Sequence, residues 1–404
     1  MKWIYLLVNV FLLASSEPRQ KRIFNVFNLV TFQNGPCVSQ DSKNGTCYTA
    51  EQCTELNGKS SGPCAQGYGV CCVFSFGCGQ QTAQNNTYFE SNAPTTGDCM
   101  ATVCPSSNDI CQMRLDFNQF VITGPSTSSI STGTQIYGLV NALGSTLAIS
   151  RASQCLTDSF SILGSSSTPI PVICGTNKGQ HVYVEVEPQT CVQMMMSLGS
   201  TGIVTTLAQR RWSIKTTQYA CNYPNLAPKG CTQYHFSLIG TGTVQTFNFD
   251  GGQHLASQDH TICVRRENGN CRICWTAASV SDFMTSGMSQ KGYAKSSECC
   301  GYGATGAGTN FDCVQIPGAL DQTMTSNLGA FTQFCGRSVG LVAASSALTV
   351  GASKTICSDR MPFQVRFLSD AFENEDEIDP TKGGPNAGAK LTYFQTNKGC
   401  RTTR

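Results

Sequence analysis

Residues that could carry out hydrolysis are few in this chain of 404 residues. Its histidines are His181, His235, His254 and His260, and none of them follows an Ala-Ala-type segment that leads into a cysteine. No Gly-Asp-Ser-Gly segment offers a nucleophilic serine. His181 opens an alternating segment, which favours a surface side chain over a general base. A Ser-His-Asp group can assemble from distant residues, but the sequence favours a protein that is not an enzyme.

Two short motifs suggest nucleotide or metal chemistry. Residues 301–306 match the G-x-G-x-x-G string, which needs a buried strand before it and a helix after it to bind a pyrophosphate. Cysteines precede this match and a Gly-rich run follows it, so we interpret it as a loop. Cys271 and Cys274 have the C-x-x-C spacing of zinc and redox sites. Only one such pair exists, in a strand-like setting, and we expect structural disulfides there.

An acidic run, residues 373–379, holds five carboxylates within seven residues. Such charges repel one another unless a cation or a basic partner offsets them. A solvated loop is the simplest interpretation. The run could also supply cation ligands or the rim of a site for a ligand with Lys or Arg side chains.

The chain begins like an exported protein. Residues 1–16 combine Lys2, an apolar run from Trp3 to Ala14 and the small residue Ser16, the pattern of a secretory signal peptide. The run is shorter than the roughly 20 residues that span a bilayer, so we expect secretion without a membrane anchor. The 24 cysteines are an even number, which indicates a disulfide framework in an exported chain.

The overall composition does not point to a highly charged partner. Charged residues make up 13% of the chain and the net charge is +2, which argues for neither nucleic acid nor an anionic membrane as a partner. Abundant Gly, Ser and Thr are typical of short strands joined by many turns. The length allows two or three domains.

Residues 17–34 form an expected linker with candidate modification signals near it. Arg19-Gln20-Lys21-Arg22 resembles a furin-type processing site ending at Arg22, with a solvated basic linker as the alternative. Two sequons follow, at Asn44 and Asn85, and either asparagine could carry an N-glycan if it is exposed.

Residues 35–73 hold six cysteines in a segment too short to bury a sizeable core, so cross-links must stabilise it. The spacing ends in the adjacent pair Cys71-Cys72 and resembles the arthropod clip domain, with the chitin-binding six-cysteine knot as the competitor. The clip resemblance implies the pairs Cys37–Cys71, Cys47–Cys64 and Cys53–Cys72.

Residues 78–221 resemble a CUB domain, an antiparallel β-sandwich of secreted proteins. The segment opens with Cys78-Gly79 and a Ser-x-x-Pro stretch, and Met113, Leu115 and Phe117 then alternate inward. The resemblance implies the pairs Cys78–Cys99 and Cys155–Cys174.

Residues 231–400 resemble a second CUB domain. In its strand over residues 363–367, Phe363, Val365 and Phe367 face a core while Gln364 and Arg366 face water. The resemblance implies the pair Cys313–Cys335, although Cys299 and Cys300 compete for these partners.

Many CUB domains bind calcium with one Glu and two Asp residues, and calcium prefers several oxygen ligands from converging loops. In the second copy, Asp312 and Asp370 match the two Asp positions, and Asp282 is the nearest third carboxylate. The resemblance therefore implies a Ca2+ site in this domain. In the first copy Asp158 matches, but no Ser-Asp follows residues 194–196, so we expect no site there.

The sequence predicts an all-β fold: two CUB-like, jelly-roll-like β-sandwiches behind a small disulfide-rich knot. This arrangement resembles secreted arthropod CUB-domain proteins. It implies a non-enzymatic role in binding an extracellular protein or glycan, including ligands with Lys or Arg side chains. The alternatives are a structural component of matrix or cuticle, and an inactive regulator of, or enzyme related to, clip-domain serine proteases.

Overall fold

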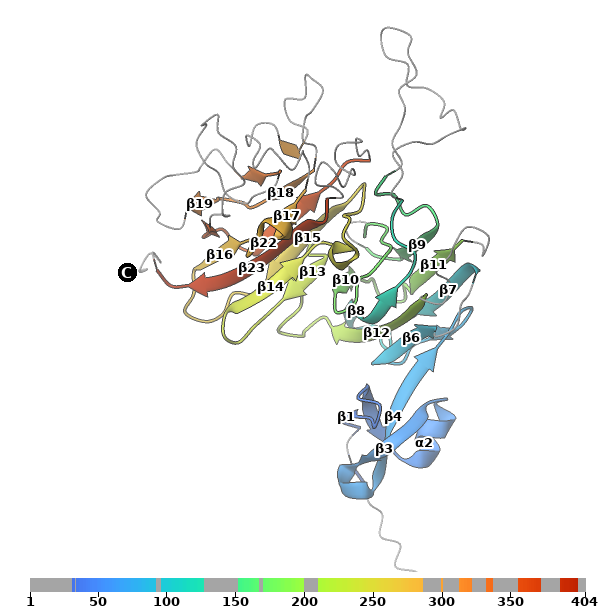
Figure 1. Ribbon diagram of the computed structural model, residues 1–404. Helices are drawn as coiled ribbons and strands as arrows, with labels where there is room; N and C mark the ends of the chain where they lie inside the picture. Colours follow the sequence, from blue (N-terminus) through green and yellow to red (C-terminus); the bar gives the residue numbers. More distant parts are fainter. Residues whose placement is uncertain are drawn as a thin grey trace, which may run out of the picture.

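A computed structural model describes residues 31–32, 34–91, 96–126, 152–166, 170–199, 210–285, 299–300, 312–321, 332–336, 355–371 and 386–398. The expected signal peptide, the basic segment ending at Arg22, the glycine-rich match and the acidic run lie outside these residues. The described chain is almost entirely β-structure, which confirms the predicted fold class. Figure 1 shows a small knot below two larger β-units that lie side by side.

The knot is a small sheet with one short helix. Its elements are β1 (Pro36–Val38), β2 (Asn44–Tyr48), α2 (Ala50–Glu55), β3 (Lys59–Cys64), the 3-10 turn η1 (Ala65–Gly67) and β4 (Gly69–Phe76). The helix starts at a capping box in which the Thr49 hydroxyl accepts from the Gln52 backbone and the Gln52 side chain accepts from Thr49. Cystines replace most of the apolar core here.

Strand β4 joins the knot to the first sandwich. Its first half pairs antiparallel with β2 and β3, and its second half pairs parallel with β6 (Thr87–Ser91), placing Phe74 opposite Thr87. One continuous strand therefore belongs to both units, and the knot is not a separate bead on a linker.

The first sandwich has two facing sheets. One sheet continues from β4 through β6, β12 (Arg211–Ala220), β8 (Ile110–Val121) and β10 (His181–Glu185). The other consists of β5 (Gln81–Thr82), β7 (Gly97–Val103), β11 (Val192–Leu198) and β9 (Asp158–Leu163). Side chains from both sheets form one buried cluster.

The second sandwich repeats this plan. One sheet runs β13 (Gln233–His235), β15 (Asp259–Val264), β22 (Phe363–Leu368), β18 (Cys313–Gln315) and β20 (Gln333–Phe334). The other runs β14 (Thr241–Gln245), β23 (Gly388–Thr396), β16 (Arg272–Thr276), β21 (Ile356–Ser358) and β19 (Leu320–Asp321), with β17 (Phe283–Met284) beside β23. The 3-10 turns η3 (Phe249–Gly251) and η4 (Val280–Asp282) connect strands.

The predicted alternation is confirmed in both cores. Met113, Leu115 and Phe117 of β8 are fully buried. In β22, Phe363, Val365 and Phe367 are buried while Arg366 is exposed. A period of two residues places these side chains on one face of a strand, and that face meets the opposite sheet.

Eleven disulfides join described cysteines. They include the five pairs implied for the knot and the first sandwich: Cys37–Cys71, Cys47–Cys64, Cys53–Cys72, Cys78–Cys99 and Cys155–Cys174. The other pairs are Cys104–Cys191, Cys111–Cys221, Cys231–Cys263, Cys274–Cys357, Cys299–Cys335 and Cys300–Cys313.

The implied pair Cys313–Cys335 is wrong. Cys335 bonds to Cys299 and Cys313 to Cys300, so both adjacent cysteines that competed for these partners are used. The reason is local: the buried cluster of Cys299, Cys313 and Cys335 brings all these sulfurs together, and spacing alone does not choose among them. In the C-x-x-C segment, Cys274 bonds to Cys357 on the neighbouring strand, as a structural cystine.

The two sandwiches contact each other directly. The Tyr183 N–H of β10 donates to the Thr232 carbonyl oxygen at 2.8 Å. The Asn248 N–H donates to the Asn177 side-chain oxygen at 2.7 Å, and the Gln180 amide to the Thr246 carbonyl at 2.9 Å. Gly175 approaches Asn248 so closely that a Cβ would clash with its side chain.

His181 lies in this junction, so the expectation of a surface side chain is wrong. Its exposed fraction is 4% because the strand β13 of the second sandwich covers it. The alternation of a single strand shows which residues share a face but does not show that a second domain packs on that face.

Candidate functional site

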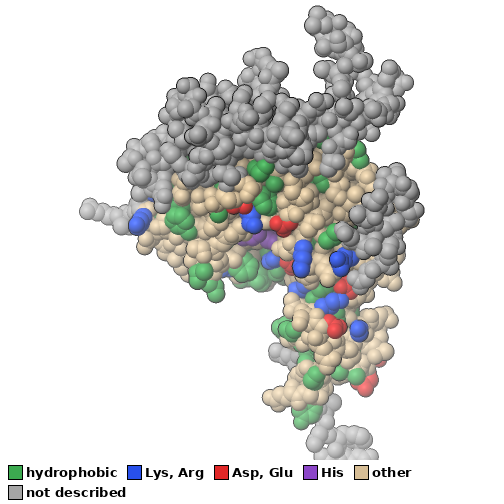
Figure 2. Space-filling model, viewed as in Figure 1, with side chains coloured by type: hydrophobic (Ala, Val, Ile, Leu, Met, Phe, Trp, Pro, Cys, Tyr) green, Lys and Arg blue, Asp and Glu red, His purple; other side chains and the backbone are tan. Residues whose placement is uncertain are grey.

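A groove of about 600 Å³ lies where the knot meets the first sandwich. Figure 2 shows Lys, Arg, Asp and Glu side chains gathered around this junction. The turn between β1 and β2 forms one wall, and strands β6, β8 and β12 form the other. The lining is almost entirely polar: Asp41, Ser42, Lys43, Asn44, Tyr88, Glu90, Asp116, Asn118, Gln119, Ser213 and Lys215.

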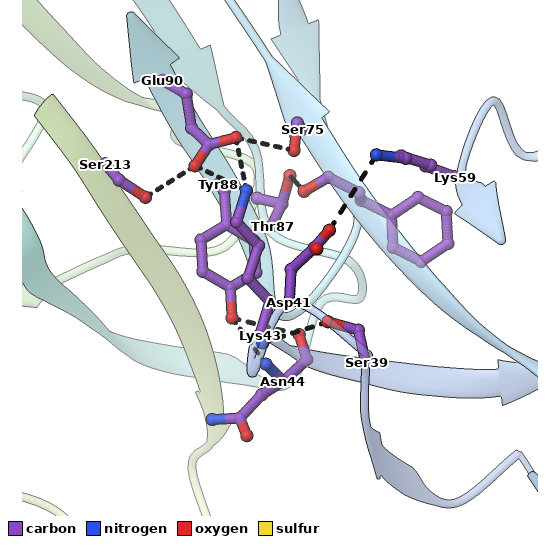
Figure 3. A network of polar contacts seen from close by, with 11 residues as sticks. Ser39, Asp41, Lys43, Asn44, Lys59, Ser75, Thr87, Tyr88, Glu90 and Ser213 are labelled. Atoms are coloured by element: carbon purple, nitrogen blue, oxygen red, sulfur yellow. Dashed lines mark hydrogen bonds and ion pairs between the residues drawn. The ribbon is translucent and has the colours of Figure 1, made fainter. Parts of the chain in front are cut away.

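An ion pair between Lys43 and Glu90 fixes the two walls together (Figure 3). The Lys43 Nζ donates to both carboxylate oxygens, at 2.7 and 2.8 Å. The hydroxyls of Ser213 and Ser75 donate to the same carboxylate at 2.7 and 3.1 Å. Burial opposes ionisation of Glu90, but the bonds from Lys43 and Ser213 outweigh it and lower the pKa of this carboxyl.

A second bond pair attaches the knot through Tyr88 of β6. The Asn44 N–H donates to the Tyr88 hydroxyl at 2.8 Å, and that hydroxyl donates to the Asn44 carbonyl at 3.1 Å (Figure 3). Tyr88 is fully buried and burial raises its pKa, so it stays a neutral donor. The Lys43 ammonium lies 5.1 Å from the centre of its ring. The turn is thus held in one position against the sheet.

The opposite wall carries charges of both signs. Lys215 of β12 lies directly across from Asp116 of β8, and Asp116 pairs with Arg114 at 2.7 Å. Burial lowers the pKa of Lys215, although Asp116 opposes this effect. Among the described residues, the Lys215 ammonium has no hydrogen bond or ion pair. A half-buried ammonium without a partner can accept an anionic or carbonyl oxygen from a ligand.

The predicted calcium ligands are only partly brought together. The Asp370 N–H donates to the Asp312 carboxylate at 2.9 Å, so these two residues meet as the resemblance implied. The other Asp312 oxygen lies 3.0 Å from the His254 Nε2, and His254 Nδ1 lies 2.9 Å from the Asn386 carbonyl. Asp282 instead caps its own turn, by accepting from the Ser279 N–H at 2.9 Å.

These described residues do not fit a calcium ion. Asp312 is buried and its carboxylate already faces His254 and a backbone N–H. Calcium takes six to eight oxygen ligands, and no group of three His, Cys, Asp or Glu side chains gathers for a metal within the described ranges.

Asp158 of the first sandwich pairs with a protein cation. It accepts from Arg210 Nε at 2.8 Å and from the Thr123 and Gly199 N–H groups at 2.8 and 3.1 Å. Both Asp158 and Arg210 are buried. The guanidinium and two backbone donors therefore satisfy this carboxylate.

The two sequon asparagines differ in their surroundings. Asn44 is exposed at the rim of the groove. The Asn85 side chain accepts from the Gln218 N–H at 2.8 Å and donates to the Gln218 carbonyl at 3.4 Å. A glycan on Asn85 would take one of the two hydrogens of the amide nitrogen that makes this contact, whereas no such side-chain bond is found at Asn44 among the described residues.

Sequence reasoning missed the groove residues. Lys43, Glu90 and Lys215 lie in three segments far apart in the sequence, and none belongs to a motif. The sequence held only a weak signal for the groove, namely a charged residue in each of three segments: Lys43 in the turn before Asn44, Glu90 in β6 and Lys215 in β12. The pairing of β6 with β12 brings Glu90 near Lys215, and the shared strand β4 brings the turn with Lys43 to the same sheet.

The fold and the groove define a disulfide-linked protein of paired β-sandwiches with a polar surface site. Residues 228–396 match the family model of the animal CUB domain, which covers the second sandwich. A search of curated proteins found no match.

A comparison with solved structures also found matches. The CUB1-EGF-CUB2 domains of rat MASP-1 are 11% identical and cover 78% of this chain and 99% of that chain, with a TM-score of 0.21. The CUB1-EGF-CUB2 domain of human MASP-1/3 is 11% identical, and the match covers 76% of this chain and 99% of that chain, with a TM-score of 0.21. The extracellular region of zebrafish Gpr126/Adgrg6 is 9% identical, and the match covers 80% of this chain and 34% of that one, with a TM-score of 0.24. At these TM-scores the CUB assignment depends on the family match alone.

Proposed function

We propose that this is a secreted extracellular binding protein that holds a charged segment of a partner protein in the groove between the knot and the first sandwich. A CUB domain in residues 228–396 and eleven disulfides support an extracellular binding role. Within the described residues, no helix is long and apolar enough to cross a membrane.

The lining of the groove favours a charged polypeptide over an apolar small molecule. Asp41 is largely exposed, and its contact with Lys59 is only a 3.9 Å pair between two exposed side chains. Such a pair contributes little, so Asp41 is available to a Lys or Arg side chain of a ligand. Lys215 meets an acidic side chain or a main-chain carbonyl of the same segment. The observation that carries the proposal is this unpartnered ammonium in a groove whose walls are fixed.

A photo-crosslinking experiment tests this proposal. A photoreactive residue replaces Ser42 in the groove, and in the control it replaces Ser281, which is exposed on the second sandwich. Both full-length proteins are irradiated in the extracellular fluid of the source tissue. We expect one protein adduct through position 42 that is absent through position 281. Equal adducts at both positions, or none at position 42, would contradict the proposal.

Calcium dependence stays a prediction from the sequence, and the His254 contact to Asp312 argues against it. Calorimetric titration of the full chain with calcium tests it, with Asp312→Ala and Asp370→Ala as controls. Heat that both substitutions abolish would establish the site. Absence of binding heat in the parent protein would show that the protein does not bind calcium at this site.

A further inference from the structure

Three side chains at one turn of the second sandwich are exposed in an unusual way. Leu238 and Ile239 are 88% and 82% exposed, more than any other large hydrophobic residue in the described chain. Phe236 beside them is 54% exposed. We call these three side chains the apolar tip. They lie on the connection between β13 and β14 (Figure 1). Scattered single residues of this kind are normal, but a cluster is a signal of contact with a partner.

The local turn chemistry also sets this segment apart. The Gly240 N–H donates to the Ser237 carbonyl at 2.8 Å, so Leu238 and Ile239 occupy the two central positions of a tight turn. Gly, Pro, Asn, Asp and Ser are the residues that favour such positions. A leucine and a β-branched isoleucine there contribute nothing to the core. Residues that violate a local rule without a structural gain are expected at functional sites.

The base of the apolar tip is held firmly. The Arg265 guanidinium lies 4.8 Å from the centre of the Phe236 ring, and the Arg265 N–H donates to the His235 carbonyl at 2.8 Å. Gln395 of β23 links both sides: its N–H donates to the Gly240 carbonyl at 2.8 Å and its side chain to the Arg265 carbonyl at 2.7 Å. The tip is therefore presented outward by a fixed frame.

The surroundings of the tip are positively charged. Arg265 pairs with Glu267, while Arg266 next to it and Lys398 beyond β23 are exposed. These three cations against one carboxylate give a local excess that the whole-chain charge of +2 does not reveal. The Arg265 guanidinium lies against Phe236 of the tip, and a cation beside an exposed apolar group suits a bilayer surface, which has anionic headgroups outside and hydrocarbon inside.

We propose that the apolar tip inserts into an anionic lipid surface, with Arg266 and Lys398 contacting the headgroups. A convex tip needs a complementary pocket on a protein, whereas a lipid surface receives it without one. The segment is a surface contact and not a membrane span. The tip is on a different sandwich from the groove, so the two sites act independently.

Co-sedimentation of the full chain with vesicles tests this proposal. One set of vesicles is phosphatidylcholine alone, and the other contains one-third phosphatidylserine. We expect the parent protein to bind the phosphatidylserine vesicles at least tenfold more tightly, and added salt to weaken that binding. The Leu238→Ser/Ile239→Ser double variant should lose at least tenfold in binding. Val38→Ser, which removes a 67% exposed apolar side chain on the knot, should leave binding unchanged.

Several outcomes would overturn the inference. These are no binding of the parent protein to either vesicle, equal binding to both, or unchanged binding of the double variant. If the parent binds no vesicles, a protein partner becomes the better occupant of the tip. A groove variant such as Lys215→Met should bind vesicles as tightly as the parent protein. Failure of the vesicle test would therefore leave the proposed function of the groove unaffected.

Discussion

At the scale of single residues, the structure depends on carboxylates whose oxygens contact basic side chains of the protein. Glu90 binds Lys43 and two serine hydroxyls, Asp158 binds Arg210, and Asp312 contacts His254. A buried carboxylate that loses its partner is costly because nothing replaces the lost hydration. Each of these contacts joins segments that are distant in the sequence.

Glu90→Gln should loosen the knot on the first sandwich. The amide keeps the shape of the side chain but loses the negative charge to which the Lys43 ammonium and two hydroxyls donate hydrogen bonds. We expect the contact between the knot and the sandwich to weaken by about 1–2 kcal/mol. Hydrogen exchange of the amides in β1 and β2 should become faster. Glu55→Gln, on the exposed side of α2, is the matched control and should leave exchange unchanged. Equal rates in both variants would show that the Lys43 contact does not hold the knot.

Arg210→Gln should destabilise the first sandwich strongly. It leaves the Asp158 carboxylate buried without its cation, which costs about 3–5 kcal/mol in comparable cases. Arg211→Gln changes the exposed neighbouring arginine and should cost less than about 0.5 kcal/mol. Denaturant unfolding monitored by tryptophan fluorescence, to which the buried Trp212 of this sandwich contributes, compares the two. Similar midpoints would mean that the ion pair is not important for stability.

At the scale of elements, the contact of β10 with β13 contains two histidines. The rings of His181 and His235 are 4.7 Å apart, and His181 Nε2 lies 3.0 Å from the Tyr234 backbone. Burial and the nearby Arg114 guanidinium lower the pKa of His235 to about 4. Burial, Arg114 and His235 also lower the pKa of His181 well below its usual range. The junction is thus built for neutral imidazoles.

Acid should weaken this junction. Because both pKa values are lowered in the folded protein, the unfolded chain takes up protons first as the pH falls below about 6.5. Stability is full above that pH and falls toward pH 4, by up to about 1.4 kcal/mol per pH unit for each histidine. Small-angle scattering should show the two sandwiches separating in this window. A His181→Gln/His235→Gln variant should respond less, and an unchanged pH response in that variant would assign the effect elsewhere.

Many of the strands and their buried faces could be predicted from the sequence, because the alternation of apolar and polar residues along a strand shows which of its faces is buried. Phe363, Val365 and Phe367 show this. The cystines of the knot could be predicted too, from the pairing that the resemblance to clip domains implies. The burial of His181 and the partner of Cys313 could not be predicted. Both depend on which other segment packs alongside, and neither spacing nor periodicity contains that information.

At the scale of the whole molecule, strand β4 and the hydrogen-bonded junction between the sandwiches join the three units into one continuous body (Figure 1). Two surfaces of this body point outward with distinct chemistry, a mixed-charge groove and an apolar tip. A protein with both could hold a partner near a lipid surface. The central claim is that the groove binds a partner. Its walls come from the knot and from the first sandwich, which meet only in the folded protein.

Calorimetric titration with the partner protein that photo-crosslinking identifies tests this claim most directly. The Asp41→Asn/Lys215→Met variant removes a charge of each sign from the groove, and Asp250→Asn/Lys229→Met makes the same changes at exposed sites outside it. We predict at least a tenfold loss of affinity, about 1.4 kcal/mol, for the groove variant and none for the control. Equal affinity of the two variants for the partner would contradict the account.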